Sequence, residues 1–196
     1  MTLYEYDLAL SAEFPVIAGA DEAGRGPLAG DVYAAAVILP HGCIIDGVND
    51  SKKLTEKRRE LLFDEIISRA EAYCIATATV DEIEELNILN AAMLAMKRAI
   101  EGLGAGYDIA LIDGNKTPDV KNARALVKGD ATSQTVAAAS ILAKVSRDRY
   151  MAELDLIYPE YGFKKHKGYG TALHYEMLRK YGPSPVHRPS FLKKMH

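Results

Sequence analysis

Short apolar runs most constrain what this 196-residue chain can fold into. Each has the length of a buried strand and is bounded by charged or turn-forming residues. The first two follow one another across a Gly-rich turn, whereas stretches with helical spacing separate the later ones. Strands that come first and then alternate with helices are typical of an α/β layer fold with a mixed sheet. The runs predicted to form strands are 16–20, 32–39, 72–80, 108–112 and 123–127.

Amphipathic spacing and capping residues predict four helices between and after these strands. Thr55 and Glu56 have the character of a helix start, and a capping-box pattern at 81–84 opens the second helix, which Gly102 ends. The third helix is rich in alanine, so it can lie close to a sheet. The predicted helices are 55–70, 81–100, 133–157 and 171–180, and 41–50 is expected to be a loop.

Carboxylates follow three of the predicted strands. Asp21 and Glu22 come directly after the first run, Asp113 follows the fourth and Asp130 follows the fifth. A carboxylate at the end of a buried strand is costly unless a positive charge compensates it. In open α/β sheets, ligands bind at the strand ends. Taken alone, Asp21-Glu22 could equally be a polar strand exit, but the recurrence at three strand ends favours a shared site.

A two-metal centre is the chemistry that would use these four acids. Carboxylates that converge on one point repel each other unless cations lie among them. Two divalent ions roughly 3.5–4 Å apart can activate water and stabilise the leaving oxygen in phosphoryl transfer. Because the motifs contain no His or Cys, hard Mg²⁺ or Mn²⁺ is favoured over zinc. Asp21, Glu22, Asp113 and Asp130 are therefore the predicted catalytic residues and metal ligands.

Several other classes of protein lack their signatures in this chain. It contains no Walker-type phosphate loop, no dinucleotide-binding glycine motif and no nucleophile elbow. No apolar run reaches membrane-spanning length, and the first residues do not resemble a signal peptide. Cys43 and Cys74 are far apart and are expected to be reduced thiols. A cytoplasmic protein without membrane contact is the expectation.

Charge is distributed unevenly along the chain. The formal net charge is −3, yet the segment 163–196 carries eight lysines and arginines against one acid, Glu176. A basic segment on an acidic body suits a polyanionic partner. The alternative is a solvated basic terminus with no partner.

Seven motifs occur in order along nearly the whole chain. Together they resemble the bacterial type 2 ribonuclease H family (ribonuclease HII). A single one would be weak, but the set is highly specific. The motifs are Asp-Glu-Ala-Gly-Arg-Gly-Pro at 21–27, Asp-Ser-Lys-Lys-Leu at 50–54, Asp-Gly-Asn at 113–115, Lys-Gly-Asp at 128–130, the segment 138–148, His-Lys-Gly-Tyr at 166–169, and His-Arg with Ser-Phe at 187–191.

The resemblance implies a ribonuclease H-like fold with a central mixed five-stranded sheet, flanking helices and a small helical C-terminal segment. One catalytic domain would span 1–196, with 163–196 as a basic substrate-binding segment. The implied activity is hydrolysis of RNA in RNA–DNA hybrids and incision 5′ to single ribonucleotides in duplex DNA, leaving a 3′-hydroxyl and a 5′-phosphate. Such an enzyme would act in ribonucleotide excision repair and DNA replication, and we expect a monomer.

The resemblance also implies roles for individual residues. The four metal-binding acids of the family map onto Asp21, Glu22, Asp113 and Asp130. The backbone of Gly24, Arg25 and Gly26 would contact the ribose 2′-hydroxyl, and Tyr169 would sense the RNA–DNA junction. An ordinary loop tyrosine is the alternative for Tyr169.

The remaining candidates have both substrate-binding and structural interpretations. Arg25 could contact substrate or brace the turn by pairing with an acid. Lys52, with Lys53, could reach a phosphate or be solvated. Ser140 and Lys144 share a helix face expected to look toward Asp130.

Asp148 could be taken for a fifth metal ligand, but a salt bridge with a nearby Arg or Lys is the preferred interpretation. His166, His174 and His187 are expected on the phosphate side or in packing rather than on a metal.

Two rival functions remain open from the sequence. One is a catalytically idle nucleic-acid-binding module that uses the basic segment, and the other is a metal-dependent phosphatase or sugar-phosphate enzyme on a related α/β sheet. Metal-dependent cleavage separates the enzyme from the first rival. Competition by hybrid duplex separates it from the second.

Overall fold

A five-stranded mixed sheet forms the centre of the computed structural model, which describes residues 1–193. The strand order is β3-β2-β1-β4-β5, with antiparallel pairing among the first three and parallel pairing of β1 with β4 and β4 with β5. All five predicted strands are present. Their bounds are β1 Ile17–Ala23, β2 Val32–Ile38, β3 Ala72–Ala78, β4 Ile109–Asp113 and β5 Ala123–Leu126.

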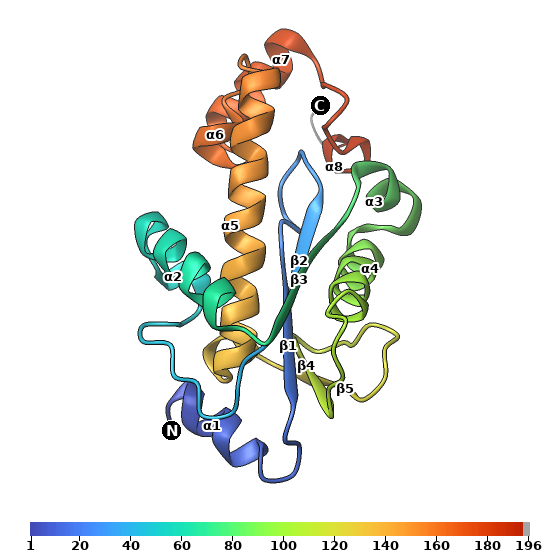
Figure 1. The fold of residues 1–196 in the computed structure, drawn as a ribbon. Coiled ribbons are helices and arrows are strands. Elements are labelled where there is room, and N and C mark those ends of the chain that lie inside the picture. The colour runs from blue at the N-terminus through green and yellow to red at the C-terminus, as the bar shows by residue number, and fades with distance from the viewer. Residues whose placement is uncertain (194–196) are drawn as a thin grey trace.

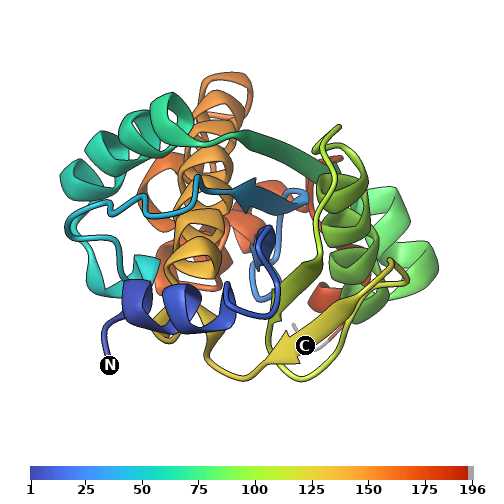
Figure 2. The same ribbon diagram turned by 60° about the horizontal axis from the view of Figure 1, so that its bottom comes forward.

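Helices cover both faces of the sheet (Figures 1 and 2). On one face lies the long α5, with α1 and α2 beside it, and on the other lie α3 and α4. None of the helices within 1–193 is long and apolar enough to cross a membrane. The helices are α1 Leu3–Leu10, α2 Glu56–Arg69, α3 Val80–Leu86, α4 Ile88–Glu101, α5 Gln134–Ile157, α6 Phe163–His166, α7 Ala172–Tyr181 and α8 Pro189–Leu192, with short 3₁₀ turns at Ser51–Lys53 (η1) and Gly129–Ala131 (η2).

Small residues let α5 lie directly on the sheet, as its composition predicts. Ala137, Ala138 and Ala139 are fully buried against the sheet face. A Cβ on Gly19 would lie 2.5 Å from the main-chain carbon of Thr135, so only glycine fits at that point of β1. The start of α5 is thereby fixed over β1, two residues before Asp21.

The strand β1 is longer than predicted. It pairs with β4 only as far as Ala20 opposite Ile112, but it continues along β2 to Ala23. Asp21 and Glu22 therefore lie within β1 and not after it, at the point where β4 no longer pairs with it. The carboxyl end of β4, Asp113, lies at the same edge of the sheet because the two strands are parallel.

Two helix predictions are wrong in detail. The predicted helix 81–100 is two helices, because Asn87 adopts a φ of +68° and its side chain caps the start of α4. The capping box that opens α3 is formed by Thr79 and Glu82, not at 81–84. The helix α1 was not predicted. Its one buried residue is Asp7, so it has no apolar stripe that periodicity could detect.

The C-terminal segment is folded through Lys193, the last described residue, and packs around the far end of α5 (Figure 1). The two short helices α6 and α8 accompany the predicted helix α7. One member of its basic set, Arg188, is completely buried. That arginine is therefore part of the interior and not of a basic tail, whereas Lys164 and Arg179 are exposed.

Candidate active site

A surface groove at the end of β1 collects most of the predicted site residues. Nine of the eleven line it, and only Asp113 and Asp130 do not. The groove also takes in Ile88, at the start of α4, and Arg147, on α5; Arg147 belongs to the 138–148 motif, but neither residue had been given a role from the sequence. The nine residues are Asp21, Glu22, Gly24, Arg25, Gly26, Lys52, Ser140, Lys144 and Tyr169.

Asp21 is the most deeply buried of the four predicted acids. Its side chain accepts a hydrogen bond from Ser140 and lies near Glu22 and Asp113. Burial, followed by the charges of Glu22 and Asp113, raises the pKa of Asp21 well above its usual value. Burial also raises the pKa of Glu22, although Arg25 opposes that shift.

Asp113 and Asp130 lie together at the end of β4. The main-chain N–H of Asp130 donates to Asp113 Oδ1 at 3.3 Å. Asp130 lies in η2, four residues beyond the end of β5, because the left-handed conformation of Lys128 turns the chain there. Burial and the charges of Asp113 and Asp50 raise the pKa of Asp130. Asp50 is thus a further acid at this site; it belongs to the 50–54 motif, but the sequence did not indicate that it would lie beside Asp130.

The four acids are close neighbours, and each already has a partner. Glu22 is paired with Arg25, Asp21 accepts from Ser140, and Asp130 is bonded to Asp50. Within residues 1–193, no three acidic, histidine or cysteine side chains are arranged around one point as a metal would require. A bound ion would therefore displace these partners by side-chain rotation.

The chemistry of the donor set nevertheless fits hard divalent ions. All the donors are carboxylate oxygens, and Asp21, Glu22 and Asp130 have a raised pKa, because burial followed by nearby negative charge disfavours their ionised forms. Asp21, Glu22, Asp113 and Asp130 are the residues that would hold Mg²⁺ or Mn²⁺.

Lys52 provides a positive charge near the acids. The charges of Asp130, Asp21, Asp50 and Asp113 raise its pKa above the usual value. It lies in η1, which Asp50 caps by accepting from the Lys52 N–H at 2.9 Å. Lys53, in contrast, points to solvent and pairs loosely with Asp50. Of the two lysines, Lys52 is therefore the one that lines the groove.

The loop after β1, residues 24–30, is held from behind by Arg188. All five N–H donors of its guanidinium bond to carbonyls of this loop: Nη2 to Gly24 at 2.7 Å and to Gly30, Nη1 to Arg25 and Pro27, and Nε to Gly30 at 2.8 Å. With its carbonyls turned toward Arg188, the loop keeps a fixed shape.

Arg147 and the backbone conformation make Gly24 indispensable to this loop. Gly24 has a φ of +100°, and a Cβ there would lie 2.0 Å from Arg147 Nε. Arg147 is itself fixed, since it donates to the carbonyls of Ala29, Asp31 and Lys167. The space that a side chain at position 24 would occupy is thus filled by a buried arginine on α5.

Two exposed side chains beside the loop, those of Arg25 and Tyr169, line the groove. Arg25 Nη1 lies 3.3 Å from Glu22 Oε1. Of the two interpretations of Arg25, this is the one in which it braces the turn by pairing with an acid. Tyr169 is 46% exposed. A Cβ on Gly26 would lie 3.5 Å from the Tyr169 ring, so the tyrosine stands directly beside the loop.

The preferred interpretation of Asp148 is confirmed. Its carboxylate accepts from Lys144 Nζ at 2.7 Å and lies 3.7 Å from Arg59. Ser140, one turn before Lys144 on α5, bonds to Ser51 at 2.9 Å as well as to Asp21. Both predicted residues of α5 therefore face the groove, each with a partner inside the protein.

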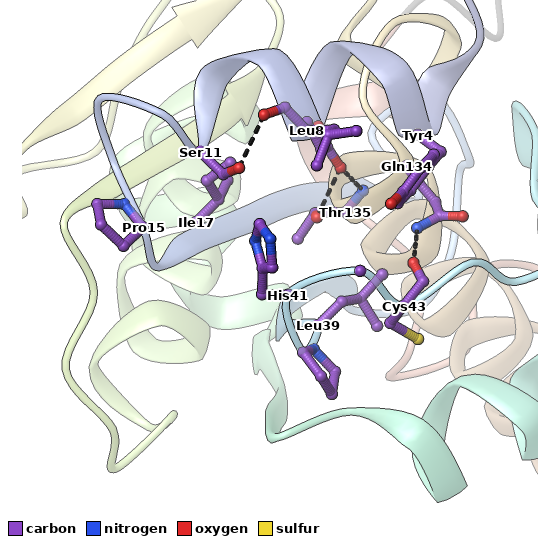
Figure 3. A pocket seen from close by; sticks show the side chains of 13 residues that line it. Tyr4, Leu8, Ser11, Pro15, Ile17, Leu39, His41, Cys43, Gln134 and Thr135 are labelled. Carbon is purple, nitrogen blue, oxygen red and sulfur yellow. Dashed lines mark hydrogen bonds between the residues drawn. The ribbon is translucent and has the colours of Figure 1, made fainter.

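A second pocket lies beneath α1, away from the acids (Figure 3). There Asp7 Oδ2 accepts from both the N–H and the hydroxyl of Thr135 at 2.8 Å, and Gln134 donates to the carbonyl of Cys43. These bonds attach α1 and the 39–43 segment to the start of α5. Cys43 and Cys74 are free thiols, as expected.

Comparison with known proteins gives one consistent result. The sequence profile described as "Ribonuclease HII" matches residues 18–194. The chain is 56% identical to the ribonuclease HII of Caldicellulosiruptor bescii over 187 residues, covering 95% of this chain and 91% of that protein. It is 58% identical to that of Marinomonas sp. over 178 residues, covering 90% and 89%.

The same similarity holds in three dimensions. The crystal structure of ribonuclease H2 from Pyrococcus horikoshii superimposes with a TM-score of 0.76 at 30% identity, covering 92% of this chain and 96% of that one. The predicted ribonuclease H-like fold with a mixed five-stranded sheet is confirmed.

Proposed function

Because this chain belongs to the ribonuclease HII family and is a metal-dependent ribonuclease H, we propose that it hydrolyses RNA strands in RNA–DNA hybrids and incises duplex DNA at single ribonucleotides. Incision falls on the 5′ side of the ribonucleotide and leaves a 3′-hydroxyl and a 5′-phosphate. Asp21, Glu22, Asp113 and Asp130 are the proposed catalytic acids.

One observation carries the proposal. Acids distant in the sequence meet at one end of the sheet, where burial and mutual repulsion raise the pKa of Asp21 and Asp130. Keeping such groups in a charged, buried cluster costs folding free energy, so their use lies in binding cations. The groove beside them is open to solvent and lined by Arg25, Lys52 and Tyr169.

The two ions, when bound, would supply an activated water and stabilisation of the leaving 3′-oxygen. The protein's own residues would place the scissile phosphate. Lys52, among the acids, and Lys144, on α5, are the two lysines that line the groove, and both are proposed to approach phosphate oxygens. Arg25 is paired with Glu22 in this structure, and it would be available to substrate when Glu22 holds a metal ion.

Selectivity for RNA requires a reader of the 2′-hydroxyl, which DNA lacks. The 24–26 segment suits this task, because its carbonyls at Gly24 and Arg25 are occupied by Arg188 and its glycines permit close approach of a sugar. Tyr169 stands beside Gly26, where it can stack on the neighbouring sugar at an RNA–DNA junction.

The test is cleavage of a DNA duplex that contains one ribonucleotide, with the product mapped to the nucleotide, in Mg²⁺, in Mn²⁺ and in chelator. We expect one cut on the 5′ side of the ribonucleotide that needs metal. An all-DNA duplex is the control for selectivity. Binding without cleavage in either metal would contradict the proposal and favour an idle binding module.

A further inference from the structure

Three buried histidines lie behind Tyr169, and two of them form a continuous hydrogen-bonded chain. His187 Nδ1 is 2.9 Å from the N–H of Ser184, and its Nε2 is 2.9 Å from Nε2 of His174. His174 Nδ1 is in turn 2.9 Å from the carbonyl oxygen of Tyr169. The chain thus runs from the main chain at 184 to the main chain at 169. Both imidazoles are fully or almost fully buried.

The main-chain groups at the two ends fix the direction of the chain. A backbone N–H can only donate, so His187 Nδ1 accepts from Ser184 and its proton lies on Nε2. A carbonyl can only accept, so His174 donates from Nδ1 and its Nε2 is bare. The His187 Nε2–H therefore points at the bare His174 Nε2. Each ring has one allowed neutral tautomer, and a second proton on either ring would break a bond of the chain.

The chain connects the two walls of the groove. The strand-like segment before Arg188 pairs with the 24–30 loop, through a bridge between Ala29 and His187 and a bond from the Gly30 N–H to the Val186 carbonyl. The opposite wall carries Tyr169. Two ties already join the walls before the tyrosine's α-carbon: the Leu28 N–H donates to Gly168, and Arg147 donates to both Lys167 and Ala29. The bonds from the Tyr169 N–H to His166 and from the Thr171 N–H to Tyr169 stay within the tyrosine's own wall. The histidine chain adds a tie between the walls on the other side of the tyrosine's α-carbon.

From this arrangement, and resting on the proposed function, we infer that His174 and His187 are positioning residues that set the orientation of Tyr169 relative to the Gly24–Gly26 segment. Ties across the groove on only one side of the α-carbon leave the tyrosine free to tilt toward or away from the opposite wall, whereas a tie on the other side restrains that motion. The pair acts through the tyrosine and touches no reacting atom. Its contribution is therefore to incision at an RNA–DNA junction, the step that we assign to Tyr169.

The first experiment tests the chain in the wild-type protein. Two-bond ¹H–¹⁵N correlation spectra of the histidine rings at pH 7 distinguish the two neutral tautomers. We expect a proton on Nε2 for His187 and on Nδ1 for His174, with neither ring charged. The exposed His41 serves as the averaging reference. A proton on His187 Nδ1, or rapid averaging of either buried ring, would overturn the inference.

The second experiment removes the hydrogen bond between the two rings by substituting each histidine in turn. In His174→Asn the amide can still donate to Tyr169, and in His187→Asn the side chain can still accept from Ser184. We expect each variant to lower kcat for the single-ribonucleotide duplex about three- to tenfold, the scale of one hydrogen bond. The double variant should lose no more than either single variant, because only one shared bond is removed. The matched control His41→Asn should leave the rate unchanged.

The third measurement asks whether the effect passes through the tyrosine. In a Tyr169→Ala background, His174→Asn should cost less than twofold, because nothing remains to be oriented. An equal loss in both backgrounds would make the pair a general structural element and overturn the inference. Cleavage by the wild type with no change in either histidine variant would also overturn it. Absence of metal-dependent cleavage by the wild type would instead overturn the proposed function itself.

Discussion

The acidic end of the groove (Asp21, Glu22, Asp113 and Asp130) and the arginine pair behind its loop (Arg147 and Arg188) are both buried, charged clusters. They differ in how the charge is satisfied. Arg188 donates all five of its N–H groups to carbonyls, and Arg147 donates to three. The acids lie close to one another, and burial followed by their mutual repulsion raises the pKa values of Asp21 and Asp130.

This difference distinguishes the cluster that stabilises the fold from the cluster that is available to bind a ligand. A charge whose hydrogen bonds are complete stabilises the surrounding structure and has no capacity left for a ligand. A cluster whose charge is uncompensated is unfavourable until something positive binds. The two clusters should therefore respond oppositely to substitution: loss of an arginine should damage folding, and loss of an acid should damage function alone.

The largest expected effect is on catalysis. Asp113→Asn should lower the cleavage rate by on the order of 10³-fold in Mg²⁺, because even partners outside the metal shell typically cost 10–100-fold. Binding of hybrid duplex and the free energy of unfolding should be retained. Asp119→Asn, an exposed aspartate paired only with Lys97, is the matched control and should cleave normally. A near-normal rate for Asp113→Asn would remove the acid from the mechanism.

Arg188→Ala should have the largest effect on stability. It leaves four carbonyls without a donor and a cavity behind the loop, so we expect the free energy of unfolding to fall by about 3 kcal/mol. Urea unfolding followed by circular dichroism measures this loss. The exposed Arg179→Ala on α7 should stay within about 0.5 kcal/mol of the wild type. Equal effects of the two substitutions would show that burial of Arg188 contributes nothing.

Asp21→Asn should shift stability in the other direction. The folded protein raises the pKa of Asp21, so at pH 7 the ionised group costs folding free energy, and the amide removes that cost. In chelator we expect the variant to be roughly 1–2 kcal/mol more stable than the wild type. Saturating Mn²⁺ should stabilise only the wild type appreciably. A less stable variant in chelator would mean that the acid is structural.

The prediction with the smallest effect near neutral pH concerns the titration of His187. Burial, followed by the nearby His174, lowers the pKa of His187 to about 4. Between pH 6.5 and 4 the unfolded chain binds a proton on this ring that the folded chain does not, so the free energy of unfolding should fall as the pH falls.

The slope from this ring is at most about 1.4 kcal/mol per pH unit. It is measured as the difference between urea titrations of the wild type and His187→Asn, because the acids contribute alike to both. Identical slopes would show that His187 titrates normally.

Much of this molecule could be predicted from its sequence, for physical reasons. Apolar runs identify buried strands from the local sequence alone. Parallel strands then bring their carboxyl ends to the same edge of the sheet. For that reason Asp21 and Asp113 could be placed together in advance. Where the chain departs from periodicity, prediction failed. Asn87 splits a helix through a positive φ, and α1 buries an acid instead of an apolar stripe.

Charge was the least predictable property. Counting residues assigned Arg188 to a basic surface, because composition does not tell a solvated guanidinium from one enclosed by carbonyls. The burial of Arg147 could not be predicted either, because an arginine in a long helix is usually exposed to solvent. The roles of Asp50 and Ser140 beside the acids also depend on contacts that only folding creates.

The bond from Arg188 to Gly24 spans 164 positions of the chain. During synthesis the acids of β1 emerge early, and the sheet can begin to assemble around them. The loop that follows has no anchor until the ribosome has added Arg188. A chain released before that residue would carry the four acids but lack the arginine that fixes the 24–30 loop. Under the proposed function, discrimination between RNA and DNA would then be the last property that this protein acquires as it is made.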